Sequence, residues 1–384
     1  MRHGQAVGLL SQAILRERHN KAVNAAQPAQ NKPAKTFMLT LKSYNFYSKL
    51  CPKVLRKLPF WPLFLIFSAC WLPSASFGFD LQGHRGARGL APENTLAAFE
   101  QALRLGVTTL ELDIGVTADG VVVVAHDPYL NPAFTRDSSG QWLASAKGPL
   151  INSLSLAELQ SHDVGRINPA SPYAATFNSQ QARDGQVIPT LAAVFERVTA
   201  LKAANVRFNI ETKLNPLQPT DTASAEVMTQ AVLDVIRKAG MQKRVTLQSF
   251  DWRSLKLVQR IEPAIPTACL SSPSGNLPDA RWTAGLRLAD YGSVPELVMA
   301  AGCQIWSPQH SSLTQDQVIK AQQLGLHVMP WTVNAPADMQ KLLEWRVDGI
   351  ITDYPDRLRS VLQQRGMPLP APVDTEKNAG SIKP

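Results

Sequence analysis

Residues 108–127 read TTLELDIGVTADGVVVVAHD, and this stretch decides the fold because it holds two strands of different kinds. The first strand is expected over 108–114. The second, over 121–125, is strongly β-branched and follows after only six residues. A crossover between parallel strands needs about a dozen residues or more, so these two strands must form an antiparallel hairpin.

The turn of this hairpin sets which residues face each other across it. Asp119-Gly120 is a pair that two-residue hairpin turns favour. With that turn Asp113 lies opposite His126, and the hairpin brings His126 back beside the end of the first strand. A register change of one residue would alter this pairing.

Outward from the hairpin, β-branched runs alternate with helical patterns, which is typical of parallel strands joined by crossover helices. One such helix is expected over 95–105 and ends at Gly106, and another follows Thr190, its expected N-cap. The eight expected parallel strands are 80–84, 108–114, 207–213, 244–249, 267–271, 304–307, 327–333 and 349–352. The chain is therefore predicted to be an α/β protein, a TIM (β/α)8 barrel with a β-hairpin after its second strand.

Two segments depart from this alternation. Residues 127–189 are too long for a simple connection and are rich in Pro, Ser, Asn and Gly, so we expect a small insertion subdomain that caps the barrel mouth. Residues 366–384 contain spaced prolines followed by polar residues, which predicts a disordered tail. The barrel with its insertion is thus expected over 79–365.

The basic charge of the chain is confined to its first 78 residues. They hold eleven Lys/Arg and one acid, whereas the whole chain carries +9, so residues 79–384 carry −1. A nucleic-acid partner would need basic charge across the fold, so none is expected. The hydrophobic share of 45% is enough to bury a large core and excludes an intrinsically disordered chain.

The basic leader, residues 1–78, has the order of a secretory signal. A basic cluster at 53–57 precedes an apolar run at 58–72, and mostly small residues follow at 74–78. The run is shorter than the roughly 20 residues of a membrane-spanning helix. We therefore expect a periplasmic or secreted protein without a stable membrane span in its mature form. An uncleaved anchor, lipidation at Cys70 and a start at Met38 are the alternatives.

Two of the four cysteines, Cys269 and Cys303, lie outside the leader. An even count suits an oxidising compartment, and both residues lie at neighbouring expected strands. The sequence leaves two interpretations of this pair, a disulfide or two buried thiols. No Cys/His cluster in the sequence has the spacing of a zinc site.

Chemistry-bearing residues recur where the expected strands end, which is where function collects in a barrel of this type. In chain order these ends carry His84-Arg85, Glu111 with Asp113, His126-Asp127, Glu211 with Lys213, Ser249-Phe250, Trp331-Thr332 and Asp353. Glu111 and Asp113 share one strand face because side chains alternate along a strand. Three acids that converge on one barrel mouth suit a hard cation such as Mg²⁺ or Ca²⁺.

Histidines and basic residues complete the expected site. His84 and His126 can divide general acid and general base work, while Arg85 and Lys213 can bind phosphate. Each feature taken alone has a plainer explanation. Lys213, for example, would equally neutralise the neighbouring acid Glu211. The combination at four successive strand ends favours metal-assisted cleavage of a phosphate ester.

The same residues resemble the motif series of the glycerophosphodiester phosphodiesterases over about residues 80–362. The matching motifs are His84-Arg85-Gly86, Pro92-Glu93-Asn94-Thr95, Glu111-Leu112-Asp113, His126-Asp127, Glu211-Thr212-Lys213, Ser249-Phe250, Trp331-Thr332-Val333-Asn334 and the run from Gly349 to Pro355. This ordered combination is highly specific, and no member of the series is missing.

The resemblance implies a role for each member of the site. It implies one divalent cation, Ca²⁺ or Mg²⁺, held by Glu111, Asp113 and Glu211, with Glu93 as a further polar contributor. It also implies His84 and His126 as the general acid and base, Arg85 and Lys213 on the phosphate, and Trp331 against the glycerol carbons. His162, His310 and His327 match no motif and are expected to be structural or surface residues. Core packing is the alternative for Trp331.

The implied reaction is metal-dependent hydrolysis of a small-molecule glycerophosphodiester, such as glycerophosphocholine or glycerophosphoethanolamine, to sn-glycerol 3-phosphate and an alcohol. A phospholipase-type phosphodiesterase acting on lysophospholipids or inositol lipids is an alternative. It would expose apolar residues of the insertion, and the candidates are Leu143, Leu150, Ile151 and Leu154. These residues equally suit a core of the insertion itself. A non-catalytic barrel binding protein is the other alternative, although no histidine or metal ligand is lost.

Overall fold

The computed structural model describes residues 78–379. The expected signal at 58–72 and the last five residues, 380–384, therefore lie outside the described residues. Within 78–379, no helix is both long enough and apolar enough to span a bilayer.

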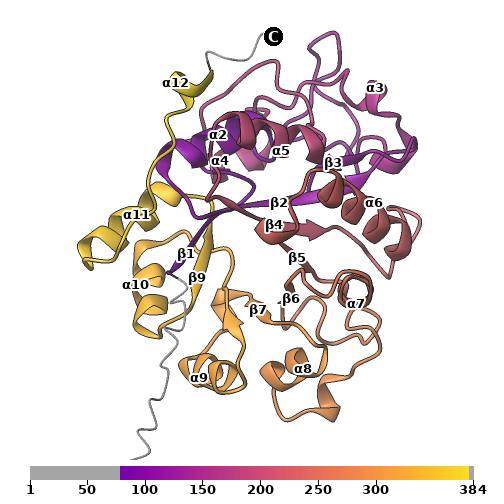
Figure 1. Cartoon of the computed structure of the whole chain (residues 1–384). Helices are drawn as coiled ribbons and strands as arrows, with labels where there is room; N and C mark the ends of the chain where they lie inside the picture. The colour runs from indigo at the N-terminus through magenta and orange to yellow at the C-terminus, as the bar shows by residue number, and fades with distance from the viewer. Residues whose placement is uncertain (1–77, 380–384) are drawn as a thin grey trace, which may run out of the picture. The chain divides into compact units, whose positions relative to one another are not determined.

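Eight parallel strands form the centre of the fold, as the sequence predicts. They are β1 (Asp80–Gly83), β2 (Thr109–Val116), β4 (Arg207–Thr212), β5 (Val245–Ser249), β6 (Thr267–Ser271), β7 (Ile305–Pro308), β8 (His327–Val328) and β9 (Gly349–Thr352). Neighbours follow the order β8-β7-β6-β5-β4-β2-β1-β9. Backbone hydrogen bonds from Asp348 N to Val328 O and from Ile351 N to Pro330 O, both 3.1 Å, join the two ends of this order. The sheet is thus a TIM barrel (Figure 1).

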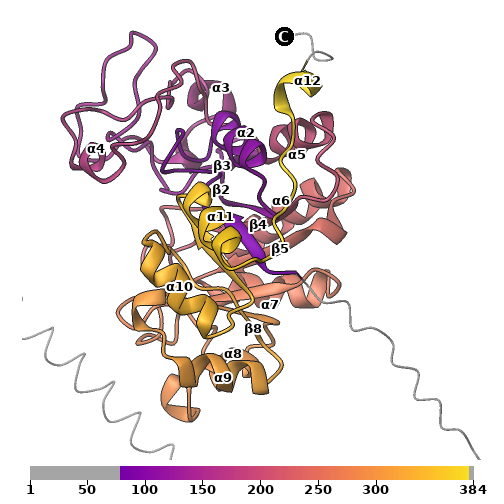
Figure 2. The same cartoon turned by 90° about the vertical axis from the view of Figure 1, so that its left-hand side faces the viewer.

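Eight helices follow the strands and surround them (Figures 1 and 2). They are α2 (Leu96–Leu105), α5 (Leu191–Ala200), α6 (Ala225–Lys238), α7 (Trp252–Ile261), α8 (Val294–Ala300), α9 (Gln315–Gln323), α10 (Pro336–Glu344) and α11 (Pro355–Gln364). The predicted cap is present, since the Thr190 side chain accepts a hydrogen bond from Ala193 N. Thr95 caps α2 in the same way, by accepting from Ala98 N. The apolar faces of the helices pack against the strands and form one hydrophobic core with them.

The hairpin after β2 is present, but its register differs from the prediction by one residue. Strand β3 (Val122–Val124) pairs antiparallel with β2 and places Ile114 opposite Val124. Asp113 O accepts from Ala125 N at 3.0 Å, so Asp113 does not lie opposite His126. The cause is a three-residue loop between Thr117 and Val121, whose third residue, Gly120, has a left-handed φ of 81°. Such a loop is the next commonest after the two-residue turn.

The insertion, residues 127–189, has a small hydrophobic core of its own. Its buried members are Leu130, Ile151, Leu159, Val164 and Ile188, and Val123 of β3 joins them. Leu143 and Leu154 pack against this cluster. Three of the four residues considered for lipid contact are therefore used inside the insertion. Its short helices are η1 (Ile151–Ser153), α3 (Leu156–Leu159) and α4 (Pro172–Thr176).

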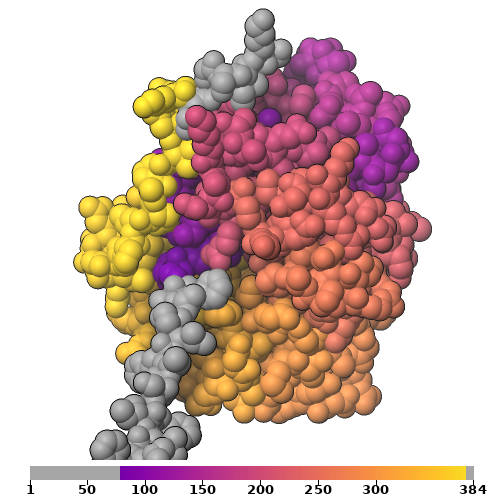
Figure 3. All heavy atoms as spheres, viewed as in Figure 1, coloured from indigo at the N-terminus to yellow at the C-terminus, as the bar shows by residue number. Residues whose placement is uncertain are grey.

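The predicted disordered tail is wrong as far as residue 379. Met367, Leu369 and Val373 pack against the barrel core, and Val373 N donates to Leu103 O of α2 at 2.9 Å. The chain then forms α12 (Thr375–Ala379). Figure 1 shows this segment running along α2, and Figure 3 shows its yellow atoms against the indigo ones of the early chain. The apolar residues that alternate with the prolines and flank them give the segment enough apolar surface to bury, which the proline pattern alone obscures.

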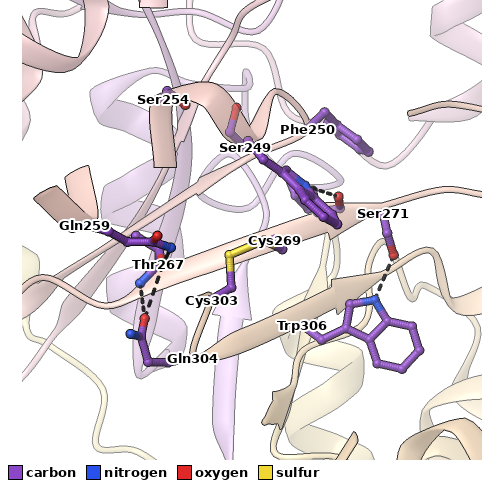
Figure 4. The surroundings of a disulfide bond; sticks show 12 residues. Ser249, Phe250, Ser254, Gln259, Thr267, Cys269, Ser271, Cys303, Gln304 and Trp306 are labelled. Carbon is purple, nitrogen blue, oxygen red and sulfur yellow. Dashed lines mark hydrogen bonds between the residues drawn. A yellow bond between two sulfur atoms is a disulfide. The ribbon is translucent and has the colours of Figure 1, made fainter. Parts of the chain in front are cut away.

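Cys269 and Cys303 are joined in a disulfide, with their Cα atoms 5.9 Å apart (Figure 4). Cys269 belongs to β6, and Cys303 immediately precedes β7, the neighbouring strand. Both residues are buried. Of the two interpretations that the sequence leaves open, the structure has the disulfide.

Candidate active site

Three buried acids from two neighbouring strands meet at one end of the barrel. Glu111 and Asp113 lie on β2, and Glu211 lies on β4 directly beside Asp113 in the sheet register. One carboxylate oxygen from each residue lies within 4.8 Å of the other two. Adjacent parallel strands in register place equivalent positions at the same height, so the three side chains point at one spot.

These three residues form an acid trio, Glu111, Asp113 and Glu211. Their carboxyl groups are buried and repel one another. Burial raises the pKa of Glu111, and Asp113 beside it raises that pKa further. Burial also raises the pKa of Glu211 to about 7, although Lys213 opposes the shift. Burial alone would raise the pKa of Asp113 as well, but the charge of Arg85 holds it well below its usual range. A positive charge beside the trio would stabilise the ionised carboxylates.

The trio fits a divalent cation by its oxygen atoms. Within the described part of the chain, Oδ1 of Asp113 is buried and has no hydrogen-bond partner. Its other oxygen is held by Asn94 Nδ2 at 3.0 Å. Glu111 is oriented by Gln248 Nε2 at 2.8 Å and by the backbone N of Arg85 at 2.9 Å. Fixed carboxylates with an oxygen to spare are the donor set that Mg²⁺ and Ca²⁺ take.

His84 lies at the end of β1, between the trio and the last strand. Its Nδ1 is 2.6 Å from Oδ1 of Asp353. Because an ionised carboxylate only accepts, Nδ1 carries the proton and donates it in this bond. The other ring nitrogen, Nε2, lies 3.9 Å from Glu111 and faces the trio. Burial lowers the pKa of His84 to about 4.

Asp353 is itself fixed by two further residues. Arg88 donates from Nε to Oδ1 at 2.8 Å and from Nη2 to Oδ2 at 3.0 Å. Asn334 donates to Oδ2 at 2.7 Å. The orientation of the His84 ring is therefore set by a rigid carboxylate.

His126 follows the hairpin and is the more exposed of the two histidines, with 32% of its side chain accessible against 11% for His84. Its Nδ1 lies 3.0 Å from Asp127 Oδ1, and Asn131 holds the same carboxylate at 2.6 Å. In each of the two histidines, Nδ1 is thus hydrogen-bonded to the carboxylate of an aspartate.

The two expected phosphate ligands stand beside the acids. Arg85 has a left-handed backbone with φ 50°, donates from Nη1 to Glu93 at 2.7 Å and holds its Nε 3.3 Å from Asp113. Lys213 Nζ lies 2.7 Å from Glu211 and 3.7 Å from Asp113. Glu93, which the family resemblance offers as a further contributor, contacts Arg85 and is not a member of the trio.

Trp331 is half-buried and is not part of the hydrophobic core cluster. Its indole Nε1 donates to Ser307 O at 2.9 Å. Its ring meets Phe250 edge to face, with ring centres 5.3 Å apart, and Lys213 Nζ lies 5.9 Å from the Phe250 ring. Phe250 therefore connects Trp331 to the charged part of the site.

Several residues that organise the site have no role assigned to them by the sequence. Asp353 and Asn334 stand in the motif series without an assigned role, and Arg88 lies two residues beyond Gly86 of the first motif. Gln248 precedes the Ser249-Phe250 motif. Tyr173, whose hydroxyl donates to Glu93, comes from the insertion and has no signal in the sequence.

Comparison with known proteins gives consistent relatives. The model of the Glycerophosphoryl diester phosphodiesterase family matches residues 84–357. A glycerophosphodiester phosphodiesterase of Bacillus subtilis (strain 168) is 31% identical over 282 residues, which cover 72% of this chain and 84% of that protein. One of Caldanaerobacter subterraneus subsp. tengcongensis is 28% identical over 284 residues, 74% of this chain and 97% of its own length.

Solved structures share the fold. A Silicibacter pomeroyi protein assigned to the glycerophosphoryl diester phosphodiesterases has a TM-score of 0.69 and 36% identity, and the match covers 76% of this chain and 95% of that chain. An Oleispira antarctica phosphodiesterase, solved in complex with the product sn-glycerol-3-phosphate, has a TM-score of 0.56 and 24% identity over 75% of this chain and 98% of its own.

Proposed function

The chain belongs to the glycerophosphoryl diester phosphodiesterase family, an enzyme class, and from this premise we propose that its barrel mouth hydrolyses small glycerophosphodiesters with the help of one divalent cation. Glycerophosphocholine and glycerophosphoethanolamine are the proposed substrates, and sn-glycerol 3-phosphate and the free alcohol are the products. The observation that carries the proposal is the meeting of three buried acids with His84 at one end of the barrel, together with His126, which directly follows the residue bonded to Asp113 O.

Glu111, Asp113 and Glu211 would hold the cation, because their oxygens converge and Asp113 Oδ1 has no hydrogen-bond partner among the described residues. When bound, a divalent cation neutralises phosphate oxygens and makes phosphorus easier to attack. Gln248 and Asn94 keep two of the acids in orientation, so the site is formed before a cation arrives.

His84 is the proposed general base. Its proton on Nδ1 is fixed by Asp353, so Nε2 is left as the nitrogen that accepts a proton from the attacking oxygen nucleophile, either water or the glycerol hydroxyl. Attack by the glycerol hydroxyl gives a cyclic phosphate, which water then opens to the same products. The carboxylate then stabilises the imidazolium that forms. His126, which is more exposed, is the proposed general acid and protonates the alcohol that departs toward solvent.

Arg85 and Lys213 are the proposed phosphate ligands. Arg85 Nε is buried and lies 3.3 Å from Asp113 without a hydrogen-bond partner in the described chain, so its N–H is not used in a hydrogen bond there. Lys213 stands beside Phe250, and Trp331 packs on that ring. This arrangement supports a phosphate between the two basic residues and glycerol carbons against the aromatic pair.

Release of sn-glycerol 3-phosphate from glycerophosphocholine tests this function. The full chain is assayed with and without EDTA, beside His126→Ala and Glu111→Gln. His162→Ala is the matched control, since His162 lies on the insertion and its ring is hydrogen-bonded to the nearby Glu158 and Ser161. We expect release that needs added Mg²⁺ or Ca²⁺, that falls about 100-fold or more in both site variants and that persists in the control.

The contrary result would be a folded wild-type chain that binds a divalent cation and releases nothing. Turnover of lysophosphatidylcholine in the same assay would then favour the lipid-active alternative. The structure gives that alternative little support, because Ile151, Leu143 and Leu154 serve the insertion's own core.

A location outside the cytoplasm belongs to the same proposal. It is supported by the basic cluster and apolar run of the leader and by the Cys269–Cys303 disulfide, a bond that persists in oxidising compartments. Fractionation of cells that express the full chain, with N-terminal sequencing of the recovered protein, tests it. A mature N-terminus near residue 79 in the periplasm or medium is expected, whereas an intact leader in the cytosol would refute the location.

A further inference from the structure

Helix α4 of the insertion presents two aromatic residues to the segment that follows β1. Tyr173 lies in the helix and Phe177 at its C-terminal cap, one helical turn later. Their rings pack together with centres 4.8 Å apart. Phe177 is buried, with 5% of its surface accessible. Each of the two touches a different charged residue of the β1–α2 loop, residues 84–95.

Tyr173 acts on the Arg85 side of the loop. Its hydroxyl donates to Oε2 of Glu93, and the other oxygen of that carboxylate accepts from Arg85 Nη1 at 2.7 Å. Glu93 is thereby held by Tyr173 and Arg85, and its Oε2 also lies 3.9 Å from Arg88 Nη1. Tyr173 thus reaches a proposed phosphate ligand through one intermediate carboxylate.

Phe177 acts on the His84 side of the loop. The guanidinium carbon of Arg88 lies 4.6 Å from the centre of the Phe177 ring. Arg88 makes the two-pronged contact with Asp353 that orients the ring of His84. An aromatic face beneath a guanidinium stabilises the charge and restricts the direction of the side chain. Phe177 therefore reaches the proposed general base through Arg88 and Asp353.

The segment that follows α4 is hydrogen-bonded to the same loop. Gln180 Nε2 donates to Arg88 O at 2.8 Å, and Gln181 N donates to Leu90 O at 2.9 Å. These bonds hold the segment after α4 against the loop. They therefore fix the position of Tyr173 and Phe177 relative to the loop residues that the two aromatic rings contact.

The loop needs such support because its backbone is strained. Arg85 and Asn94 both have left-handed conformations, with φ of 50° and 55°. Non-glycine residues keep such conformations only where the surrounding structure determines them. The conformation matters here because Arg85 N orients Glu111 and Asn94 orients Asp113.

We propose that Tyr173 and Phe177 are positioning residues, and that the insertion is an integral part of the catalytic site. Tyr173 positions Arg85, and Phe177 positions His84. The kinetic part of this inference rests on the proposed function. Loss of the Tyr173 hydroxyl should weaken substrate binding through Arg85, whereas loss of the Phe177 ring should slow turnover through His84.

Four variants of the full chain test the proposal. Tyr173→Phe removes one hydroxyl and keeps the ring, Phe177→Leu removes the aromatic face, and Phe177→Tyr restores it. Trp142→Leu is the matched control, because Trp142 lies in the same insertion and also faces an arginine, Arg136, at 5.5 Å. Arg136 contacts insertion acids and no residue of the site.

The kinetic readout is the split between kcat and KM for glycerophosphocholine. Phe177→Leu is expected to lower kcat by about tenfold or more with little change in KM, and Phe177→Tyr to recover most of it. Tyr173→Phe is expected to raise KM several-fold with kcat largely retained. Trp142→Leu should leave both within about twofold. Equal losses in Phe177→Leu and Trp142→Leu would overturn the proposal, because they would show a merely structural role of the insertion.

Hydrogen–deuterium exchange gives a readout that does not depend on hydrolysis. The amides of Arg85, Gly89 and Asn94 are hydrogen-bonded in the structure, and Phe177→Leu should speed their exchange by about tenfold relative to wild type and to Trp142→Leu. If wild type hydrolyses nothing, the proposed function fails while this comparison still decides the positioning role. Unchanged exchange over residues 84–95 would overturn it.

Discussion

His84 Nδ1 lies 2.6 Å from Oδ1 of Asp353, although 269 positions separate the two residues in the chain. The contact exists because the first and last strands of the barrel are neighbours, with Gly83 paired to Thr352. His84 and Asp353 each follow directly from these paired residues. Closure of the barrel therefore creates the pair that sets the proton on the proposed base.

Asp353→Asn should lower kcat by about 100-fold or more and leave the affinity for sn-glycerol 3-phosphate nearly unchanged. The amide keeps the shape of the side chain but no longer stabilises a charged imidazolium. Steady-state kinetics and calorimetric product binding measure the two effects. Asp348→Asn is the control, since Asp348 pairs with His327, outside the site, at 3.1 Å. An Asp353→Asn enzyme with wild-type kcat would contradict the role given to the pair.

Added Mg²⁺ or Ca²⁺ should raise the thermal midpoint of the full chain, and Glu211→Gln should lose most of that rise. A ligand that binds only the folded state stabilises it by about 2.7 kcal/mol at 100 times its Kd. The gain arises because a cation relieves the repulsion among three buried acids. Differential scanning calorimetry at matched ionic strength compares the two metals. Equal shifts in wild type and variant would place the cation elsewhere.

Cys303→Ser should lower the free energy of unfolding by about 2–4 kcal/mol, since the disulfide closes a segment of 34 residues. Activity of the folded variant should stay close to wild type, because the bond lies between β6 and β7 and touches none of the acids or histidines (Figure 4). Denaturant unfolding measures the loss. The double variant Cys269→Ser/Cys303→Ser should cost no more than about one single variant, and additive losses would argue against the bond.

Acid should loosen the insertion through Asp184. Its hydrogen bonds with Arg166 lower its pKa to about 2, below the roughly 3.9 of an unfolded chain. A lowered carboxyl pKa stabilises the folded state above pH 4, and that contribution disappears as the pH falls toward 2. Hydrogen exchange of the insertion should therefore differ between wild type and Asp184→Asn at pH 6. The difference should vanish near pH 2, and a difference that grew with acid would contradict the sign.

Much of the fold is predictable because it depends on local patterns. β-branched runs and helical spacing locate all eight barrel strands, since each must bury an apolar face. The hairpin register is not predictable in this way. Asp119-Gly120 suits a two-residue turn, but the Thr117 hydroxyl accepts from Val121 N at 3.0 Å inside a wider loop, and that contact decides the pairing. The C-terminal segment is missed for a similar reason, since its partner, the end of α2, is remote in sequence.

The candidate site also has a part that local sequence patterns predict and a part that depends on contacts between remote segments. Residue types at strand ends, Glu111, Asp113 and Glu211 among them, are readable from the sequence because parallel strands of known direction end at one rim. The sequence by itself therefore determined the barrel and the chemistry at its mouth. Only the tertiary structure decided that Asp353 orients His84, that Tyr173 contacts Glu93 and that Phe177 contacts Arg88, because these contacts join segments whose separation carries no periodic signal.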